Sequence, residues 1–123
     1  MEPRLDFERL KAIHNALGPD FPLVLHGASS VLTTYVDLIN ANGGDMKQTR
    51  GVPEEMFATA VTMGIVKVNI DTDLRLCMTA SVRESLAGDK AMFDPRKYLG
   101  PARDALEELV IHKMTVLGCA GKA

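Results

Sequence analysis

Residue types that mark specialised classes of protein are scarce in this 123-residue chain. It has no tryptophan and only two cysteines, Cys77 and Cys119, which lie far apart and form no metal-type pair, so a reduced, cytoplasmic setting is expected. A formal net charge of −2 provides no basic surface for nucleic acid. No apolar run approaches the roughly 20 residues that span a bilayer. The mixed charges of the first ten residues do not predict a secretory signal.

Seven segments have the residue patterns of helices or strands. In the helical segments apolar residues recur every three or four positions, and proline or glycine marks several of the ends. The strand segments are short apolar runs, and the second is rich in β-branched residues. Asp94 before Pro95 is a further helix start signal. The patterns predict helices over 5–17, 33–41, 51–64, 74–86 and about 101–117, and strands over 22–26 and 65–70.

Strands that alternate with helices of these lengths favour an α/β fold with a parallel sheet covered by helices. We expect the first strand to be buried on both faces. Two sets of apolar residues are expected to be buried: Phe57, Ala60 and Val61 in the segment 51–64, and Leu106, Val110, Met114 and Leu117 in the last helix. Two strands are too few for a stable parallel sheet, so the chain is predicted to be an incomplete domain.

A polar cluster follows the first predicted strand: His26, Gly27, Ser29 and Ser30. A histidine at a strand end can bind a metal, and a glycine lets the backbone approach a ligand. Ser29, together with free backbone N–H groups, suits a phosphate. The alternative is that His26 is a hydrogen-bonded residue at the edge of the core, while Ser29 or Ser30 caps the next helix.

A second polar cluster, from Asn69 to Arg75, follows the second strand. Asn69 and Asp71 lie two residues apart on one strand face and could both contact one sugar or phosphate. In the alternative interpretation Asp71 or Thr72 is a helix N-cap and Asp73 favours the first turn. This explains Asn69 poorly, because an amide in a buried strand needs a partner. Two clusters at the same end of one sheet favour a functional site.

Five stretches of the sequence, covering nearly the whole chain in order, resemble the class II, zinc-dependent fructose-1,6-bisphosphate aldolases and the related tagatose-bisphosphate aldolases. The stretch through Arg75 and the segment "DPRKYL" favour the fructose-bisphosphate branch. The resemblance is carried by "LVLHGASS", "GVPEE", "GIVKVNIDTDLR", "FDPRKYLGPAR" and "GCAGKA".

The resemblance implies a (β/α)8 TIM barrel, of which residues 1–123 are the C-terminal part of a single domain, with strands seven and eight and their flanking helices. It implies a cytoplasmic lyase of glycolysis that cleaves fructose 1,6-bisphosphate reversibly to dihydroxyacetone phosphate and glyceraldehyde 3-phosphate. The implied cofactor is Zn²⁺, which acts as a Lewis acid, with a monovalent cation as a further candidate. Tagatose bisphosphate is the alternative substrate.

The resemblance also assigns roles to residues of this chain. His26 matches one of the three histidines that bind the zinc. Because Arg75 matches an arginine that acts across a subunit interface, a homodimer or homotetramer is implied. The substrate-binding positions are matched by Gly27 and Ser29 for one phosphate, by Asn69, Asp71 and Thr72 for hydroxyls and phosphate, and by Arg75 for the other phosphate.

Several parts of the family's pattern have no match here. The other two zinc histidines and the general acid/base aspartate are expected upstream, since His14 and His112 fall on helices with ordinary surface or edge roles. A full barrel needs roughly 250 residues. We therefore expect the isolated chain to be inactive and to need the missing N-terminal half as a partner. Leu32 stands where the family commonly has proline. The alternative function is a truncated, non-catalytic module that binds sugar phosphates or another subunit.

Overall fold

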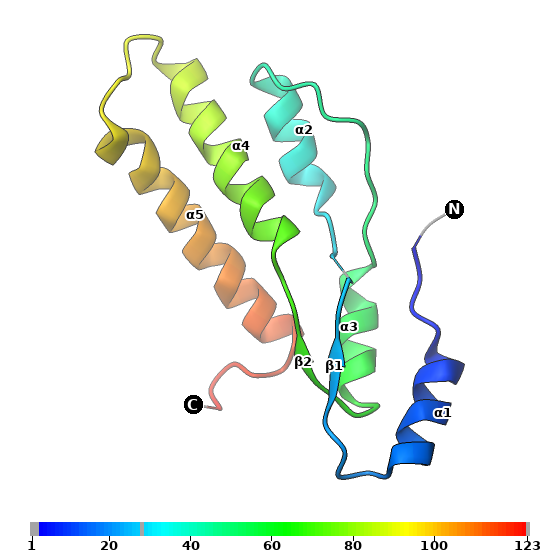
Figure 1. Cartoon of the computed structure of the whole chain (residues 1–123). Helices are drawn as coiled ribbons and strands as arrows, with labels where there is room; N and C mark the ends of the chain where they lie inside the picture. The colour runs from blue at the N-terminus through cyan, green and yellow to red at the C-terminus, as the bar shows by residue number, and fades with distance from the viewer. Residues whose placement is uncertain (1–2, 28, 123) are drawn as a thin grey trace.

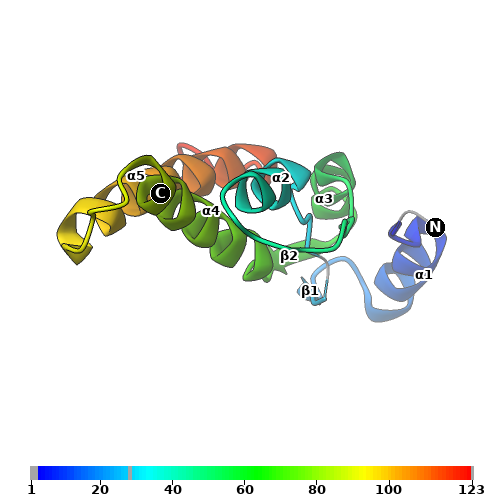
Figure 2. The same cartoon turned by 90° about the horizontal axis from the view of Figure 1, so that it is seen from above.

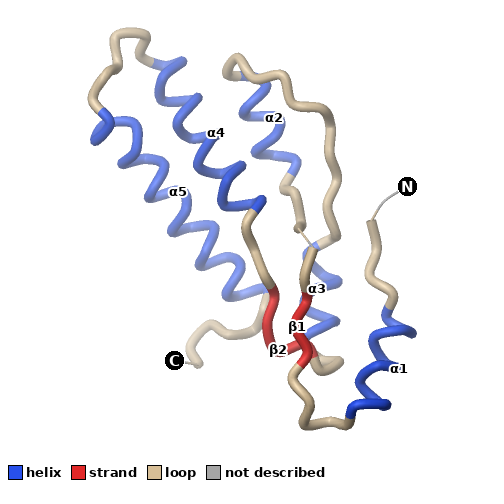
Figure 3. Tube along the Cα trace, in the orientation of Figure 1, coloured by secondary structure: helices blue, strands red, loops and turns tan. Residues whose placement is uncertain are grey.

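The computed structural model describes residues 3–27 and 29–122. Within them the chain forms five helices and two strands in the predicted order (Figures 1 and 3). None of these helices is long and apolar enough to cross a membrane. The elements are α1 (Phe7–Leu17), β1 (Leu23–Leu25), α2 (Thr33–Ala41), α3 (Glu54–Val61), β2 (Ile65–Val68), α4 (Thr72–Gly88) and α5 (Pro95–Val116).

The strands β1 and β2 form a parallel pair, and α2 and α3 make the crossover between them. Leu23 pairs with Ile65 and Leu25 with Val68, with an irregularity directly after Leu23. Past the end of β2, the backbone N–H of Asn69 donates to the Leu25 carbonyl oxygen at 3.2 Å. The pairing therefore extends to the carboxyl ends of both strands, and the residues that follow them start side by side.

Helices cover one side of this small sheet. Seen from above, α2, α3 and α5 lie on the same side of the two strands (Figure 2). Phe57 of α3 forms a buried cluster with Val52, against which Leu25 and Val68 of the strands pack. The helices α4 and α5 run side by side away from the sheet (Figure 1). A second cluster joins α2 to α4 through Val36, Ile39, Leu76 and Ala80.

The expectation that the first strand is buried on both faces is wrong. Val24 of β1 is 43% exposed, and Val66 of β2 is 68% exposed. Successive side chains of a strand point to opposite faces. Leu25 packs on the helix side, so Val24 points to the opposite face, which α2, α3 and α5 leave open (Figure 2).

The predicted buried face of the last helix is also wrong in part, although the helix itself is confirmed. Apolar residues at helical spacing show that a segment is helical, but they do not show which of two apolar stripes meets a neighbour. Val110 and Met114, which were predicted to be buried, are exposed, as are Met78 and Leu86 of α4. The prediction that Val61 of α3 is buried is also wrong. The helices α4 and α5 are instead buried through Leu76, Cys77, Ala80, Ala102 and Leu109.

The last helix also starts earlier than about residue 101. It begins at Pro95, and its N-cap Asp94 accepts a hydrogen bond from the Arg96 amide at 3.1 Å. Pro101 lies inside the helix, where it has no N–H group to donate. The start signal at Asp94 is therefore the true boundary.

Candidate functional site

The two polar clusters predicted from the sequence meet at the carboxyl end of the sheet. His26 directly follows β1 and Asn69 directly follows β2, and Asn69 Nδ2 lies 2.8 Å from His26 Nδ1. Beside this contact, Ser29 Oγ donates to Thr72 Oγ1 at 3.1 Å. The structure thus brings the clusters together. The ligands assigned to the individual residues stay predictions.

Gly27 turns the chain as it leaves β1. Its backbone φ is 69°, in the left-handed region that favours glycine. An added Cβ would meet no atom within 4 Å. The need for glycine at this position is therefore conformational, and the space beside its backbone is open.

The start of α4 is not capped in the way that the alternative interpretation supposes. Asp71 is the N-cap residue, but its side chain makes no capping hydrogen bond. It accepts instead from Arg75 Nε at 2.8 Å, and both side chains are exposed. An exposed pair of this kind contributes little stability, so Asp71 and Arg75 lie at the surface next to the strand ends without a structural role of large effect.

A buried group of charges, absent from the sequence-based predictions, lies next to the strand-end residues. Lys113 of α5 is 5% exposed. Its Nζ lies 2.8 Å from Asp73 Oδ2 and 2.5 Å from Ser30 Oγ. Lys113 also forms an ion pair with Glu54 in the first turn of α3, and the Ser30 hydroxyl donates to Asp73. We call these four residues the Lys113 network.

The carboxylates of the Lys113 network are held in the ionised form. Burial alone would raise the pKa of Asp73, but hydrogen bonds from Lys113 and Ser30 and the charge of Lys113 lower it below its usual range. The pKa of Glu54 is lowered as well. Burial would raise it, but hydrogen bonds from His112, whose Nε2 lies 2.6 Å from Glu54 Oε2, and from Lys113 lower it. Asp73 is only 2% exposed, so it depends on Lys113 for its counter-charge.

We expect this network to make the chain sensitive to acid. Because folding lowers the pKa of Asp73, its stabilising contribution is present above the unfolded-state pKa and is lost as the pH falls through the folded-state value. Urea midpoints measured from about pH 7 to about pH 3 should fall steeply below about pH 4. Asp73→Asn should flatten that fall, whereas Asp20→Asn at an exposed position should not. An equally steep fall in Asp73→Asn would contradict the assignment.

One feature of the sequence, the position of Lys113 relative to Leu109, indicates that Lys113 needs a partner. Lys113 follows Leu109 by four positions, so the two share a helix face, and Leu109 is buried. A lysine on a buried stripe needs a partner. The partner itself was not predictable, because Asp73 and Ser30 come from segments about 40 and 80 positions away.

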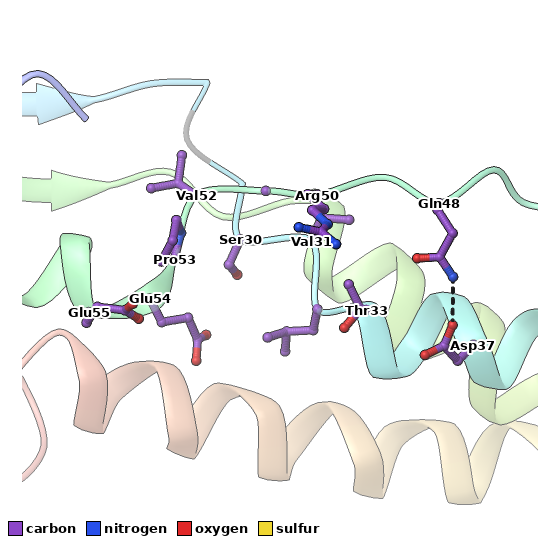
Figure 4. A pocket seen from close by; sticks show the side chains of 12 residues that line it. Ser30, Val31, Thr33, Asp37, Gln48, Arg50, Val52, Pro53, Glu54 and Glu55 are labelled. Atoms are coloured by element: carbon purple, nitrogen blue, oxygen red, sulfur yellow. Dashed lines mark hydrogen bonds between the residues drawn. The ribbon is translucent and has the colours of Figure 1, made fainter. Parts of the chain in front are cut away.

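A pocket of about 510 Å³ opens beside the Lys113 network (Figure 4). Its lining includes Ser30, Glu54 and Arg50, and the Gln48 side chain donates to Asp37 across one end at 3.1 Å. None of the seven residues predicted to bind metal or substrate lines it. The strand ends, where His26 and Asn69 meet, therefore remain the candidate site.

The comparison with known protein families covers nearly the whole chain. The family described as "Fructose-bisphosphate aldolase class-II" matches residues 1–122. The chain belongs to this aldolase family.

Named relatives of this aldolase chain come from distant organisms. The fructose-bisphosphate aldolase of Treponema pallidum (strain Nichols) is 49% identical over 122 residues, 98% of this chain and 36% of the relative. That of Thermus caldophilus is 46% identical over 121 residues, 98% of this chain and 39% of the relative. That of Giardia intestinalis is 43% identical over 120 residues, 98% and 36% of the two chains. The aldolase chain thus spans little more than a third of the length of these relatives.

In this aldolase chain the Asn69 side-chain amide faces the His26 ring, with Nδ2 2.8 Å from Nδ1 and 3.4 Å from Nε2. With the Asn69 amide nitrogen toward Nδ1, the neutral ring accepts there and carries its proton on Nε2. If the amide turns its oxygen to Nδ1, the proton moves to Nδ1 and the Nε2 lone pair becomes free for a metal. The Asn69 amide is therefore positioned to orient the His26 ring.

A complete set of metal ligands is not gathered among the described residues. Within residues 3–27 and 29–122, no three His, Cys, Asp or Glu side chains gather closely enough to hold a metal ion. His112 is paired with Glu54, and the Nδ1 atom of His14 is buried against Gly64. A zinc site of three protein ligands would need donors from outside the described residues.

Leu32 has a backbone that suits the proline expected at this position from the resemblance. It is the N-cap residue of α2 with φ −61°, and proline holds φ near −65°. The Leu32 amide, however, points to Asp73 Oδ1 at 3.4 Å. Leucine thus gives this chain a weak hydrogen bond that proline could not make.

Proposed function

We propose that this chain is the C-terminal part of a zinc-dependent fructose-1,6-bisphosphate aldolase that reversibly forms dihydroxyacetone phosphate and glyceraldehyde 3-phosphate. The contact between the loop after β1 and the start of α4, at the carboxyl ends of two parallel strands, carries this proposal. Ligands of parallel α/β folds bind at that end of the strands. The names of the relatives favour fructose bisphosphate over tagatose bisphosphate as the substrate.

The open faces of the strands support the proposal that β1 and β2 are the last two strands of a (β/α)8 barrel. Among the described residues each strand has a single neighbour, and Val24 and Val66 are exposed. In a closed barrel every strand has two neighbours, and interior side chains pack in layers. Residues 1–123 would then form one part of a single domain whose other strands supply the missing packing.

Within that site we propose distinct tasks for the residues of this chain. His26 would be one zinc ligand, oriented by Asn69. Bound zinc would polarise the substrate carbonyl as a Lewis acid. The open backbone at Gly27 and the Ser29 hydroxyl suit one phosphate. Substrate hydroxyls would be bound by Asn69, Asp71 and Thr72, and Arg75 would bind the other phosphate across a subunit interface.

We expect no aldolase activity from this chain alone, because a proton donor and two zinc ligands would lie outside it. Adding the part of the Treponema pallidum relative that this chain does not cover should restore cleavage of fructose 1,6-bisphosphate, measured by triose phosphate release. EDTA should abolish that activity. A stable joined protein that cleaves nothing with zinc present would refute the proposal. A folded chain that binds phosphate, together with a stable joined protein that cleaves nothing, would favour a non-catalytic module.

A further inference from the structure

The Lys113 network connects the two segments that carry the predicted substrate residues. Ser30 directly follows Ser29 in the chain, and Asp73 directly follows Thr72. Ser29 and Thr72 are joined on the outer side at 3.1 Å. On the inner side, Lys113 Nζ lies 2.5 Å from Ser30 Oγ and 2.8 Å from Asp73 Oδ2. The Lys113 ammonium group thus contacts both segments, through the residues next to Ser29 and Thr72.

We propose that Lys113 is a positioning residue for a phosphate subsite, and that it fixes the relative placement of Ser29 and Thr72 through Ser30 and Asp73. The nature of the ligand rests on the proposed function, whereas the link between the two segments does not. The ligand class is the phosphate group of a sugar phosphate, which the Ser29 and Thr72 hydroxyls would meet at the sheet edge.

The number of donors on Lys113 excludes direct contact with a ligand. An ammonium has three N–H donors. Lys113 directs them to three acceptors, on Ser30, Asp73 and Glu54. The side chain is also 5% exposed. Lys113 therefore acts on the strand-end site only through its protein partners.

Asp73 extends the same link to the far end of the loop. Its Oδ2 atom accepts from Ser30 and Lys113, and its Oδ1 atom faces the Leu32 amide at 3.4 Å. Asp73 thus binds the loop after β1 at two points, in addition to the contact between Ser29 and Thr72. Buried ion pairs often stabilise a fold no better than apolar residues of equal volume. The geometry of this network accordingly points to placement of the loop more than to stability.

Two sets of variants separate placement from stability. Lys113→Met leaves the Asp73 carboxylate buried without a cation and should lower the urea midpoint strongly. Lys113→Met with Asp73→Asn removes the Lys113 and Asp73 charges together, leaves Glu54 with His112, and should recover most of that loss. Ser30→Ala removes only the contacts of Ser30 with Lys113 and Asp73 and leaves the ion pairs intact. The matched control is Lys97→Met, the same substitution at an exposed position of α5.

Hydrogen exchange of the Val52 amide measures the placement of the loop directly, since it donates to the Ser29 carbonyl oxygen at 2.9 Å. We expect about tenfold faster exchange at Val52 in the double variant and in Ser30→Ala, at nearly wild-type global stability. Apparent affinity for inorganic phosphate, from protection of the loop, should fall at least about fivefold. Lys97→Met should change neither quantity.

Wild-type exchange at Val52 in both the double variant and Ser30→Ala would overturn the inference and reduce Lys113 to charge balance. If the double variant fails to fold, Ser30→Ala alone decides the question. Phosphate that protects nothing in the wild-type chain would count against the proposed function. Even in that case, exchange at Val52 without phosphate still tests whether Lys113 places the loop.

Discussion

Replacing Gly51 by alanine is expected to destabilise the chain by about 3 kcal/mol, because the new methyl group has no space. An added Cβ would lie 2.2 Å from the Ser29 carbonyl oxygen and 2.2 Å from the Ser30 carbonyl carbon and oxygen. These are backbone atoms, so no side-chain rotation can relieve the overlap. The neighbouring amide of Val52 donates to Ser29 at 2.9 Å and would have to move as well.

Urea unfolding followed by circular dichroism measures this effect, with Gly100→Ala as the matched control. Gly100 lies inside α5, and its added Cβ would meet no atom within 4 Å. That control should be neutral or more stable by up to about 1 kcal/mol, because alanine favours helices over glycine. Equal midpoints for Gly51→Ala and the wild-type chain would show that residues 50–53 do not pack on the loop after β1.

The largest expected effect on function comes from His26→Ala in the aldolase reassembled from this chain and the missing part. The substitution would remove one of three zinc ligands. Since loss of an outer-shell partner alone costs 10- to 100-fold, activity should fall by more than about 100-fold. The zinc content of the purified protein, measured by mass spectrometry, should fall together with activity.

His112→Ala is the matched control for this experiment, because it also replaces a histidine by alanine, at a position on α5. His112 contacts Glu54 at 2.6 Å and is half exposed. Its loss should leave the zinc content unchanged and alter activity by no more than about threefold. Full zinc content in His26→Ala would remove this residue from the metal site, whatever the activity.

Much of the local structure followed from the sequence because the local signals are strong. The segment 33–41 is the helix α2 with the predicted bounds, and Asp94 caps the last helix. The prediction that His26 and Asn69 share one end of a parallel sheet is confirmed by their 2.8 Å contact. Strand pairing and the direction of parallel strands fix that juxtaposition.

What the sequence did not reveal depends on which surfaces meet. The exposure of Val110 and Met114 reflects the packing of α5 through Ala102 and Leu109, and periodicity alone could not choose between the two faces. The exposure of Val24 reflects the cover of the strands by helices on one side only (Figure 2).

The sequence by itself determined the aldolase family, the order of helices and strands, and the polar residues that end each strand. Only the tertiary structure decided that Lys113 lies buried between Ser30, Asp73 and Glu54. The physical reason is separation along the chain. Helix and strand patterns arise between residues a few positions apart, whereas the partners of Lys113 are 40 to 83 positions away and meet only when the elements pack.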